Sequence, residues 1–179
     1  MSKIKGTKTE ENLLEAFITE SQVRNKYTFF AAIARFEGYE KIAAYFDDAA
    51  NNEKEHAKVW YKLLSGGEFA KTSENLKIAA AGENNEWTGM YKRMAEDARE
   101  EGLDDIAFLF ESVGTIEEEH EKQFLKLLEA LEENKVFCQD KKTIWTCRNC
   151  GYASDEKSAP EKCPVCYSPQ AYFDCAQAK

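Results

Sequence analysis

The chain has 179 residues, of which 43% are hydrophobic and 12% aromatic, enough for a real core in one ordinary domain with room for a second, smaller one. No stretch approaches the roughly 20 consecutive apolar residues of a membrane span, and the first residues do not form a secretory signal, so we expect a cytoplasmic protein. The net charge of −9 argues against a nucleic-acid partner, because phosphate binding requires a basic face.

Four helices are predicted in the first three quarters of the chain. This part contains no proline, and Gly38, the run Ser65-Gly66-Gly67 and Gly102 divide it into four segments. In each segment apolar residues recur at alternating steps of three and four, which is typical of a helix that buries one face in a bundle. We therefore expect a mainly α protein in which residues 1–137 form a four-helix bundle.

The only two histidines of the chain each end a Glu-x-x-His sequence. Glu53 and His56 interrupt the apolar face of the second segment, and Glu117 and His120 interrupt the fourth. A spacing of three residues places both side chains on one helix face, where they can hold a metal ion. A solvated helix face would explain one such pair, but two pairs at corresponding positions favour a metal site.

Carboxylates also fall on the buried faces of the first and third segments, at Glu20, Glu83 and Glu86. Burying ionised groups is costly unless cations neutralise them, so five inward carboxylates predict two divalent ions. Glu20 and Glu83 complete a two-metal carboxylate site, and Glu86 exceeds that minimum. Mixed oxygen and nitrogen ligands favour iron over zinc, while manganese stays open.

Two tyrosines lie about one helical turn from the predicted ligands and on the same faces. They are Tyr27 in the first segment and Tyr91 in the third. We expect them near the metals, with an ordinary buried tyrosine as an equal alternative for each.

The composition changes after Asn134, and residues 138–179 are predicted to form a small domain with short strands near 143–146 and 171–173. It is too small to be stable by burial alone, so a structural metal is expected. Four cysteines in two C-x2-C pairs form a tetrahedral metal site, which by spacing alone fits zinc or iron. The surrounding W-T-C-R-N-C-G-Y and K-C-P-V-C sequences favour iron. The predicted ligands are Cys147, Cys150, Cys163 and Cys166, while Cys138 and Cys175 are expected to be small buried residues or free thiols.

The chain resembles the rubrerythrin family over nearly its whole length. The resemblance rests on E-S-Q-x-R-N-x-Y at residues 20–27, N-x-E-K-E-H-A-K ending at Lys58, A-G-E-N-x-E at residues 81–86, E-E-x-H-E-K-x-F around His120, and the rubredoxin-like end of the chain. It implies a ferritin-like bundle with a di-iron site, oxo-bridged when oxidised, and a C-terminal rubredoxin-like domain with one iron. It also implies that hydrogen peroxide is reduced with electrons from NAD(P)H, delivered by a reductase or rubredoxin, in protection against oxidative stress.

The resemblance further assigns roles to individual residues. Tyr27 and Tyr91 correspond to active-site tyrosines, and one iron exchanges Glu86 for His56 on reduction. Tyr167 departs from the pattern, because rubredoxins have glycine after the second cysteine pair. The implied di-iron ligands are Glu20, Glu53, His56, Glu83, Glu86, Glu117 and His120.

The connection between the second and third segments is short. Only about eight residues, near Ser65 to Ser73, lack helix signals, and they span roughly 27 Å when extended, which is marginal for the length of a bundle. We therefore expect a homodimer, and an exchange of helix pairs between chains is compatible with it. An iron-storage protein and a zinc-ribbon interaction module fused to a structural bundle are the competing interpretations.

Overall fold

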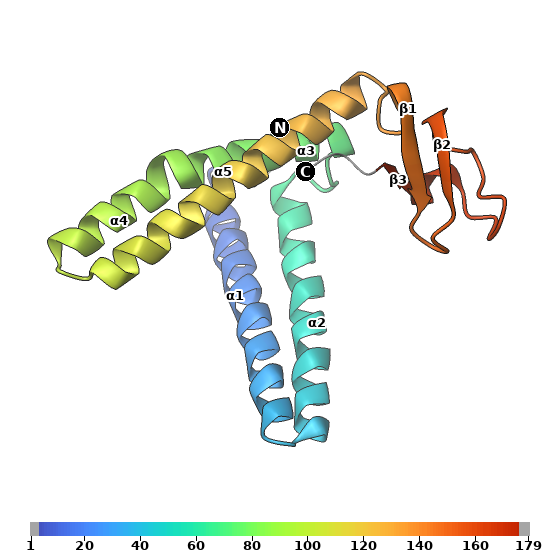
Figure 1. The fold of residues 1–179 in the computed structure, drawn as a ribbon. Coiled ribbons are helices and arrows are strands. Elements are labelled where there is room, and N and C mark those ends of the chain that lie inside the picture. Colours follow the sequence, from blue (N-terminus) through green and yellow to red (C-terminus); the bar gives the residue numbers. More distant parts are fainter. Residues whose placement is uncertain (1–3, 176–179) are drawn as a thin grey trace. The chain divides into compact units, whose positions relative to one another are not determined.

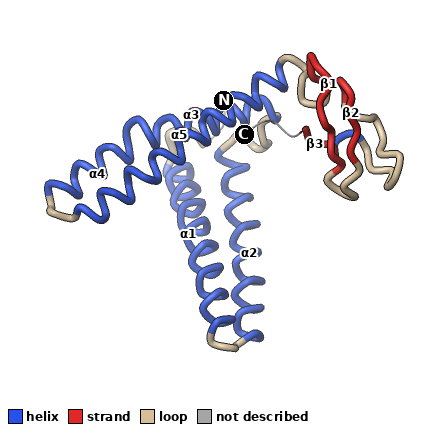
Figure 2. The backbone as a smooth tube through the Cα atoms, in the orientation of Figure 1, coloured by secondary structure: helices blue, strands red, loops and turns tan. Residues whose placement is uncertain are grey.

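The structure is a computed structural model that describes residues 4–175. Residue contacts divide the chain into two compact units, one ending at Ala70 and the other beginning at Lys71. Figure 2 shows that the first unit is helical and that strands occur only near the C-terminal end of the second. The predicted domain boundary after residue 137 is a different division of the chain, and it stays a prediction.

The first unit is a hairpin of two long helices, α1 (Lys8–Phe36) and α2 (Glu40–Leu64), which lie side by side in Figure 1. The Thr7 side chain caps α1 by accepting a hydrogen bond from the backbone N–H of Glu10. Gly38 follows α1 with φ of 87°, a left-handed conformation that glycine adopts without strain, so the predicted break is confirmed. Small residues let the two helices approach closely, and the buried ones are Ala31, Ala34, Ala43, Ala50 and Ala57.

The helical part of the second unit is also an antiparallel pair. One arm consists of α3 (Thr72–Asn85), the π-helical turn η1 (Glu86–Met90) and α4 (Tyr91–Glu100), and the other arm is α5 (Asp104–Glu132). The predicted break at Gly102 is confirmed, with φ of 76°. The link before α3 covers residues 65–71, so it is shorter than the predicted stretch because α3 begins at Thr72.

The two helical pairs repeat each other along the sequence. Asp47 pairs with Arg35, and 64 positions later Glu111 pairs with Arg99. The ring of Tyr27 lies 5.9 Å from that of Phe46, and their counterparts 64 positions later, Tyr91 and Phe110, lie 6.2 Å apart. Three buried alanines recur at the same offset, Ala31 with Ala95, Ala34 with Ala98 and Ala43 with Ala107.

The second copy contains one extra residue, and η1 contains it. Glu20 and Glu83 are 63 positions apart, whereas Tyr27 and Tyr91 are 64 apart. Between these points the backbone N–H of Tyr91 bonds to the carbonyl of Glu86, five residues back, where an α-helix would bond four residues back. The insertion is accommodated within a continuous helical arm, so Tyr91 keeps the place that Tyr27 has in the first copy.

The C-terminal residues form a three-stranded antiparallel sheet in the order β2-β1-β3. The strands are β1 (Cys138–Cys147), β2 (Ala153–Ser158) and β3 (Phe173–Cys175). Trp145 and Phe173 are buried in its small core, and the Trp145 indole donates a hydrogen bond of 3.1 Å to the carbonyl of Glu156. β2 was not predicted, since its sequence ASDEKS lacks β-branched and aromatic residues, and residues 170–172 form a 3₁₀ turn where a strand was expected.

The predicted fold class is confirmed, with four long helical segments followed by a small antiparallel sheet that contains four clustered cysteines. Within residues 4–175, no helix combines the length and the apolar character that crossing a bilayer requires.

Candidate metal centres

The first hairpin gathers three of the predicted ligands. Glu20 comes from α1, and Glu53 and His56 come from neighbouring turns of α2, as their spacing of three predicts. The His56 Nδ1 atom lies 2.8 Å from an oxygen of Glu53 and 3.9 Å from an oxygen of Glu20. One ligand atom from each residue falls within 4.8 Å of the others, so the three can hold one metal ion.

The second unit gathers an equivalent set. Glu83 comes from α3, and Glu117 and His120 come from α5. The His120 Nδ1 atom lies 2.6 Å from an oxygen of Glu117 and 3.8 Å from an oxygen of Glu83, nearly the distances found in the first hairpin. Each set, called a half-site below, therefore offers two carboxylates and one imidazole.

The electrostatics of both half-sites favour a bound cation. Burial raises the pKa of Glu20, and the adjoining Glu53 carboxyl raises it further. The pKa of Glu83 is raised in the same way, by burial and then by Glu117. Carboxylates that crowd one another away from water gain most from a metal ion, and the oxygen and nitrogen donor set fits iron or manganese.

Glu86 lies outside both groups of three among the described residues. It is the first residue of η1, and its negative charge contributes to raising the pKa of Glu83 and of Tyr91. It is therefore near the second half-site without being part of the compact set that holds His120.

The two predicted tyrosines occupy equivalent places in the repeat. Burial raises the pKa of the Tyr91 hydroxyl first, followed by the charges of Glu86, Glu117 and Glu83, so this phenol stays protonated beside the half-site. Tyr27 packs against the rings of Phe30 and Phe46.

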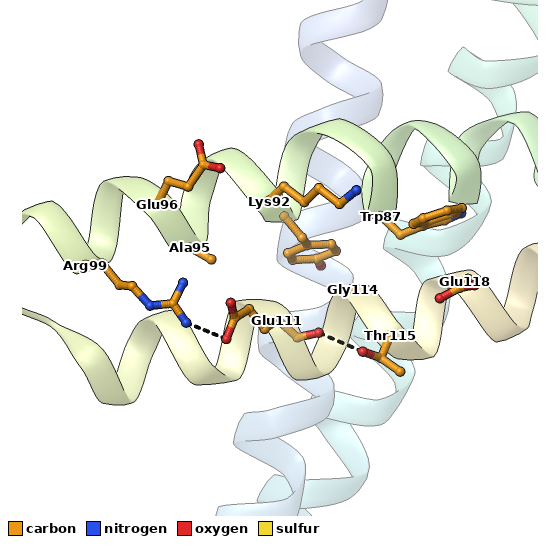
Figure 3. Close-up of a pocket in the computed structure, with 10 residues that line it drawn as sticks. Trp87, Lys92, Ala95, Glu96, Arg99, Glu111, Gly114, Thr115 and Glu118 are labelled. Carbon is orange, nitrogen blue, oxygen red and sulfur yellow. Dashed lines mark hydrogen bonds and ion pairs between the residues drawn. The ribbon is translucent and has the colours of Figure 1, made fainter.

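A cavity of about 350 Å³ lies among η1, α4 and α5 (Figure 3), and the residues around it include Trp87, Tyr91 and Gly114. The ion pair between Arg99 and Glu111, with a nitrogen–oxygen distance of 2.6 Å, borders this cavity. The sequence analysis missed Gly114, where an added Cβ would come within 3.3 Å of the Tyr91 Cβ. Its signal is that Ala50 occupies the equivalent place of the first copy, so only the second copy has glycine there.

The four predicted cysteine ligands meet at the end of the sheet domain. The Sγ atoms of Cys147 and Cys166 are 3.7 Å apart, and those of Cys150 and Cys163 are 3.6 Å apart. A tetrahedral ion with metal–sulfur bonds of about 2.3 Å separates its sulfur ligands by about 3.8 Å, so the four thiols already have the spacing of such a site.

Both cysteine pairs use the same turn. The residue after each pair has a left-handed backbone, with φ of 79° at Gly151 and 61° at Tyr167. Their N–H groups donate to the carbonyls of Cys147 and Cys163, at 2.8 and 3.0 Å. Tyr167 thus adopts the conformation of the glycine it replaces, and its ring lies 4.9 Å from the Lys162 ammonium.

Hydrogen bonds and crowding act on the thiols in opposite directions. The Asn149 side chain, followed by Ser168, lowers the pKa of Cys166 to about 5. A backbone hydrogen bond from Tyr152 lowers the pKa of Cys150, but neighbouring thiols and burial outweigh it and raise the value to about 12. Four thiolates this close require a cation, so we expect a bound metal to stabilise the domain.

The two remaining cysteines lie apart from this cluster. Cys138 is exposed and accepts a hydrogen bond of 3.3 Å from the Ser158 hydroxyl, and Cys175 is half-buried against the core of the sheet domain. Both are free thiols, as the sequence analysis expected as one alternative.

Comparison with known proteins covers almost the whole chain. The family model described as rubrerythrin matches residues 11–73 and 74–149, and the model of the rubrerythrin rubredoxin-like domain matches residues 145–174. The chain is 48% identical to a rubrerythrin of Porphyromonas gingivalis, over 96% of this chain and 91% of that protein. It is 44% identical to rubrerythrin-1 of Clostridium acetobutylicum and 43% identical to a rubrerythrin of Nitratidesulfovibrio vulgaris, over 97% of both chains in each case. The chain therefore belongs to the rubrerythrin family, with a di-iron carboxylate site of Glu and His ligands in its helices and a four-cysteine site in its rubredoxin-like domain.

Proposed function

We propose that this protein reduces hydrogen peroxide to water at its di-iron site and protects its cell from oxidative stress. The observation that carries the proposal is the pair of matching half-sites, each with two carboxylates and one imidazole. A peroxide bond requires two electrons, and a site for two redox-active ions of one kind matches that demand. We keep the predicted ligand set, which is Glu20, Glu53, His56, Glu83, Glu86, Glu117 and His120.

Each half-site alone is an incomplete metal site. Three protein ligands leave open coordination positions on an iron ion. The free-energy cost of burying the carboxylates is offset best when two ions share them. We propose that a half-site from α1 and α2 combines with a half-site from α3 and α5 to hold both irons. The combination within one chain and the combination between the two chains of a homodimer both satisfy the ligands, and the homodimer is our proposal for the assembly.

In the proposed reaction the O–O bond breaks, two electrons and two protons are taken up, and two water molecules leave. When bound, the pair of ferrous ions supplies the two electrons. Tyr91 keeps its proton next to three carboxylates, so its hydroxyl is available to donate a hydrogen bond to an oxygen atom at the site. Glu86, which lies outside the compact ligand set, is free to change its partner as the charge of the site changes.

We propose that the four cysteines hold an iron ion that returns electrons to the bundle one at a time. NAD(P)H is the proposed source, through a reductase or a rubredoxin. Iron is preferred to zinc here because zinc has no redox chemistry, although the thiol spacing suits either metal. The sheet begins at Cys138, which supports our proposed boundary between a bundle at 1–137 and a rubredoxin-like domain at 138–179. All six cysteines are free, which suits the reducing cytoplasm that we propose as its location.

The test is anaerobic mixing of the fully reduced, iron-loaded protein with hydrogen peroxide, with both iron centres followed by their absorbance. We expect the cysteine-bound iron to be oxidised only after the bundle irons, and at a rate that depends on them. Glu53→Ala, which removes a bundle ligand, should leave the cysteine-bound iron reduced for much longer, and Glu129→Gln on the exposed side of α5 is the control. If the cysteine-bound iron is oxidised equally fast in Glu53→Ala, the peroxidase proposal fails.

Two further measurements, iron uptake in the presence of oxygen and metal analysis of the purified protein, separate the competing interpretations. An iron-storage protein accumulates a ferric mineral when supplied with ferrous iron and oxygen, and it does not require the cysteine-bound iron. A zinc-ribbon interaction module is colourless and contains one zinc ion in place of the cysteine-bound iron.

A further inference from the structure

The side chain of Glu121 joins the two helical arms of the second unit at the π-helical turn. Its carboxylate accepts a hydrogen bond of 2.5 Å from the Trp87 indole N–H. It also accepts hydrogen bonds of 3.0 and 3.1 Å, one at each oxygen, from the Asn84 side-chain amide. All three residues are half-buried, so these hydrogen bonds to a carboxylate are partly shielded from water and are stronger than neutral ones.

The two residues that donate hydrogen bonds to Glu121 lie on either side of Glu86, the residue that begins the π-helical turn. Asn84 precedes Glu86 by two positions, and Trp87 follows it directly as part of η1. The Thr88 hydroxyl also donates to the Asn84 carbonyl at 2.5 Å, so it satisfies an acceptor next to the irregular turn. The backbone around Glu86 is therefore tied to α5 by side chains as well as by helical hydrogen bonds.

The first copy of the repeat has no such group of residues. At an offset of 63 positions, Ser21 corresponds to Asn84 and Arg24 corresponds to Trp87. At an offset of 64 positions, Ala57 corresponds to Glu121. Ala57 is buried and has no polar side-chain atom. Only the copy with the inserted residue has the hydrogen-bonded group, so the group and the π-helical turn occur together.

We propose that Glu121 is a positioning residue for Glu86. Through Trp87 and Asn84 it holds η1 against α5, and so it fixes where the Glu86 carboxylate enters the neighbourhood of Glu83, Glu117 and His120. The name Glu121 clamp is used below for Glu121, Trp87 and Asn84. An irregular helical turn would otherwise relax between alternative hydrogen-bond patterns, and each would point Glu86 in a different direction. This inference rests on the proposed di-iron function only for the consequence of moving Glu86, not for the contacts themselves.

The first experiment measures backbone hydrogen exchange of the full-length protein, with and without added ferrous iron. In Glu121→Gln and in Trp87→Phe we expect exchange of the amides in residues 86–91 to be about tenfold faster, with the rest of α5 unchanged. Glu129→Gln, with the same loss of charge on the same helix, should show normal exchange. The clamp is refuted if residues 86–91 exchange at the wild-type rate in both variants, or if exchange accelerates equally over the whole unit.

A double-mutant cycle identifies the contact itself. When Glu121→Gln and Trp87→Phe are combined, the increase in exchange should be much smaller than the product of the two single increases. Both changes act on the same hydrogen bond, since Trp87→Phe removes its donor and Glu121→Gln removes the charge that strengthens it. Fully multiplicative effects would show that the two residues act independently, and they would overturn the proposal.

The second readout is the ligand geometry of the loaded site. Near-infrared circular dichroism of the anaerobic ferrous protein reports the surroundings of each iron, and we expect the signal to change in Glu121→Gln and Trp87→Phe but not in Glu129→Gln. An unchanged signal in both clamp variants refutes a positioning role. This readout requires no peroxide turnover, so a failure of the clamp and a failure of the peroxidase proposal give different results.

Discussion

The two helical pairs present the same three ligand types in the same geometry, yet only the second pair is irregular. In α1 and α2 the ligands lie on continuous helices, and seven positions separate Glu20 from Tyr27. In the second unit eight positions separate Glu83 from Tyr91, and the additional residue is contained in η1. The ligands common to both copies thus require only regular helices, while the additional carboxylate Glu86 occurs where the helix is distorted.

The two tyrosines, Tyr27 and Tyr91, also differ in the residues that surround them. Both pack against an equivalent phenylalanine, but only Tyr91 lies opposite a glycine, Gly114, where the first copy has Ala50. The second copy therefore differs from the first at three places, namely η1, Gly114 and the hydrogen-bonded group of Glu121, Trp87 and Asn84. We infer that the first copy mainly supplies ligands and that the second copy also controls how one of them moves.

The largest expected effect tests whether the half-sites are equivalent. Glu20→Ala and Glu83→Ala each remove one carboxylate from a set of three, so we expect both to lower peroxide turnover at least about 100-fold and to reduce bound iron. Glu86→Ala should retain both irons while turnover falls, because this residue lies outside the compact sets. Iron analysis together with peroxide consumption measures both quantities. If Glu86→Ala loses as much iron as Glu83→Ala, Glu86 is an ordinary structural ligand.

The next effect concerns the pH dependence of the metal-free protein. The pKa values of Glu20 and Glu83 are raised, mainly by burial, so the folded state binds these protons more tightly than the unfolded state does. Their contribution to stability is fully present below the ordinary pKa of 4.5 and is lost as the pH rises through the raised values. We expect urea unfolding in the presence of a chelator to show falling stability in that window, and a flatter profile for Glu20→Gln and Glu83→Gln. Glu129→Gln should follow the wild type, and an equal slope in all four proteins contradicts the prediction.

A smaller effect is expected at the equivalent positions Gly114 and Ala50, where the two copies differ in side-chain volume. Gly114→Ala places a Cβ 3.3 Å from the Tyr91 Cβ, and such overpacking costs about 1–3 kcal/mol, partly offset by about 1 kcal/mol of improved helix propensity. We expect a net loss of about 1 kcal/mol in the free energy of unfolding. Ala50→Gly in the first copy is the matched change, and there we expect a loss from helix propensity and lost packing alone. A stabilised Gly114→Ala would mean that Tyr91 moves aside without cost.

The smallest effect is expected at the two cysteine turns, where Gly151 and Tyr167 occupy equivalent positions. Tyr167 has the left-handed backbone that Gly151 has in the other turn, and such a conformation costs a non-glycine residue roughly 1–2 kcal/mol. Tyr167→Gly should therefore raise the stability of the metal-loaded domain by about 1 kcal/mol, reduced by the loss of the Lys162 contact. Gly151→Ala should lower it by a similar amount. Thermal unfolding followed by the absorbance of the cysteine-bound iron measures both, and a destabilised Tyr167→Gly would show that the ring contact outweighs the strain.

Local signals predicted most of the fold and the candidate ligands. The glycines at the helix ends, the alternating apolar steps and the two Glu-x-x-His pairs each depend on residues close in sequence, and the helices end where those glycines lie. Strand β2 was missed because its polar sequence has no strand preference, and its place in the sheet depends on its antiparallel pairing with β1. The π-helical turn η1 was not predicted, because a regular period of 3.6 cannot represent an inserted residue.

The sequence by itself determined the family, the number of helices and the residue types of both metal centres, because spacings of three residues within helices and of C-x2-C within turns are local geometry. Only the tertiary structure decided which carboxylates form compact sets, that Glu86 stays outside them, and that Glu121 binds Trp87 and Asn84 across 34 and 37 positions. Such contacts depend on the relative rotation of two packed helices. In a regular helix one inserted residue would rotate all the following side chains by about 100°, and η1 absorbs this rotation, which no regular pattern read along a single helix predicts.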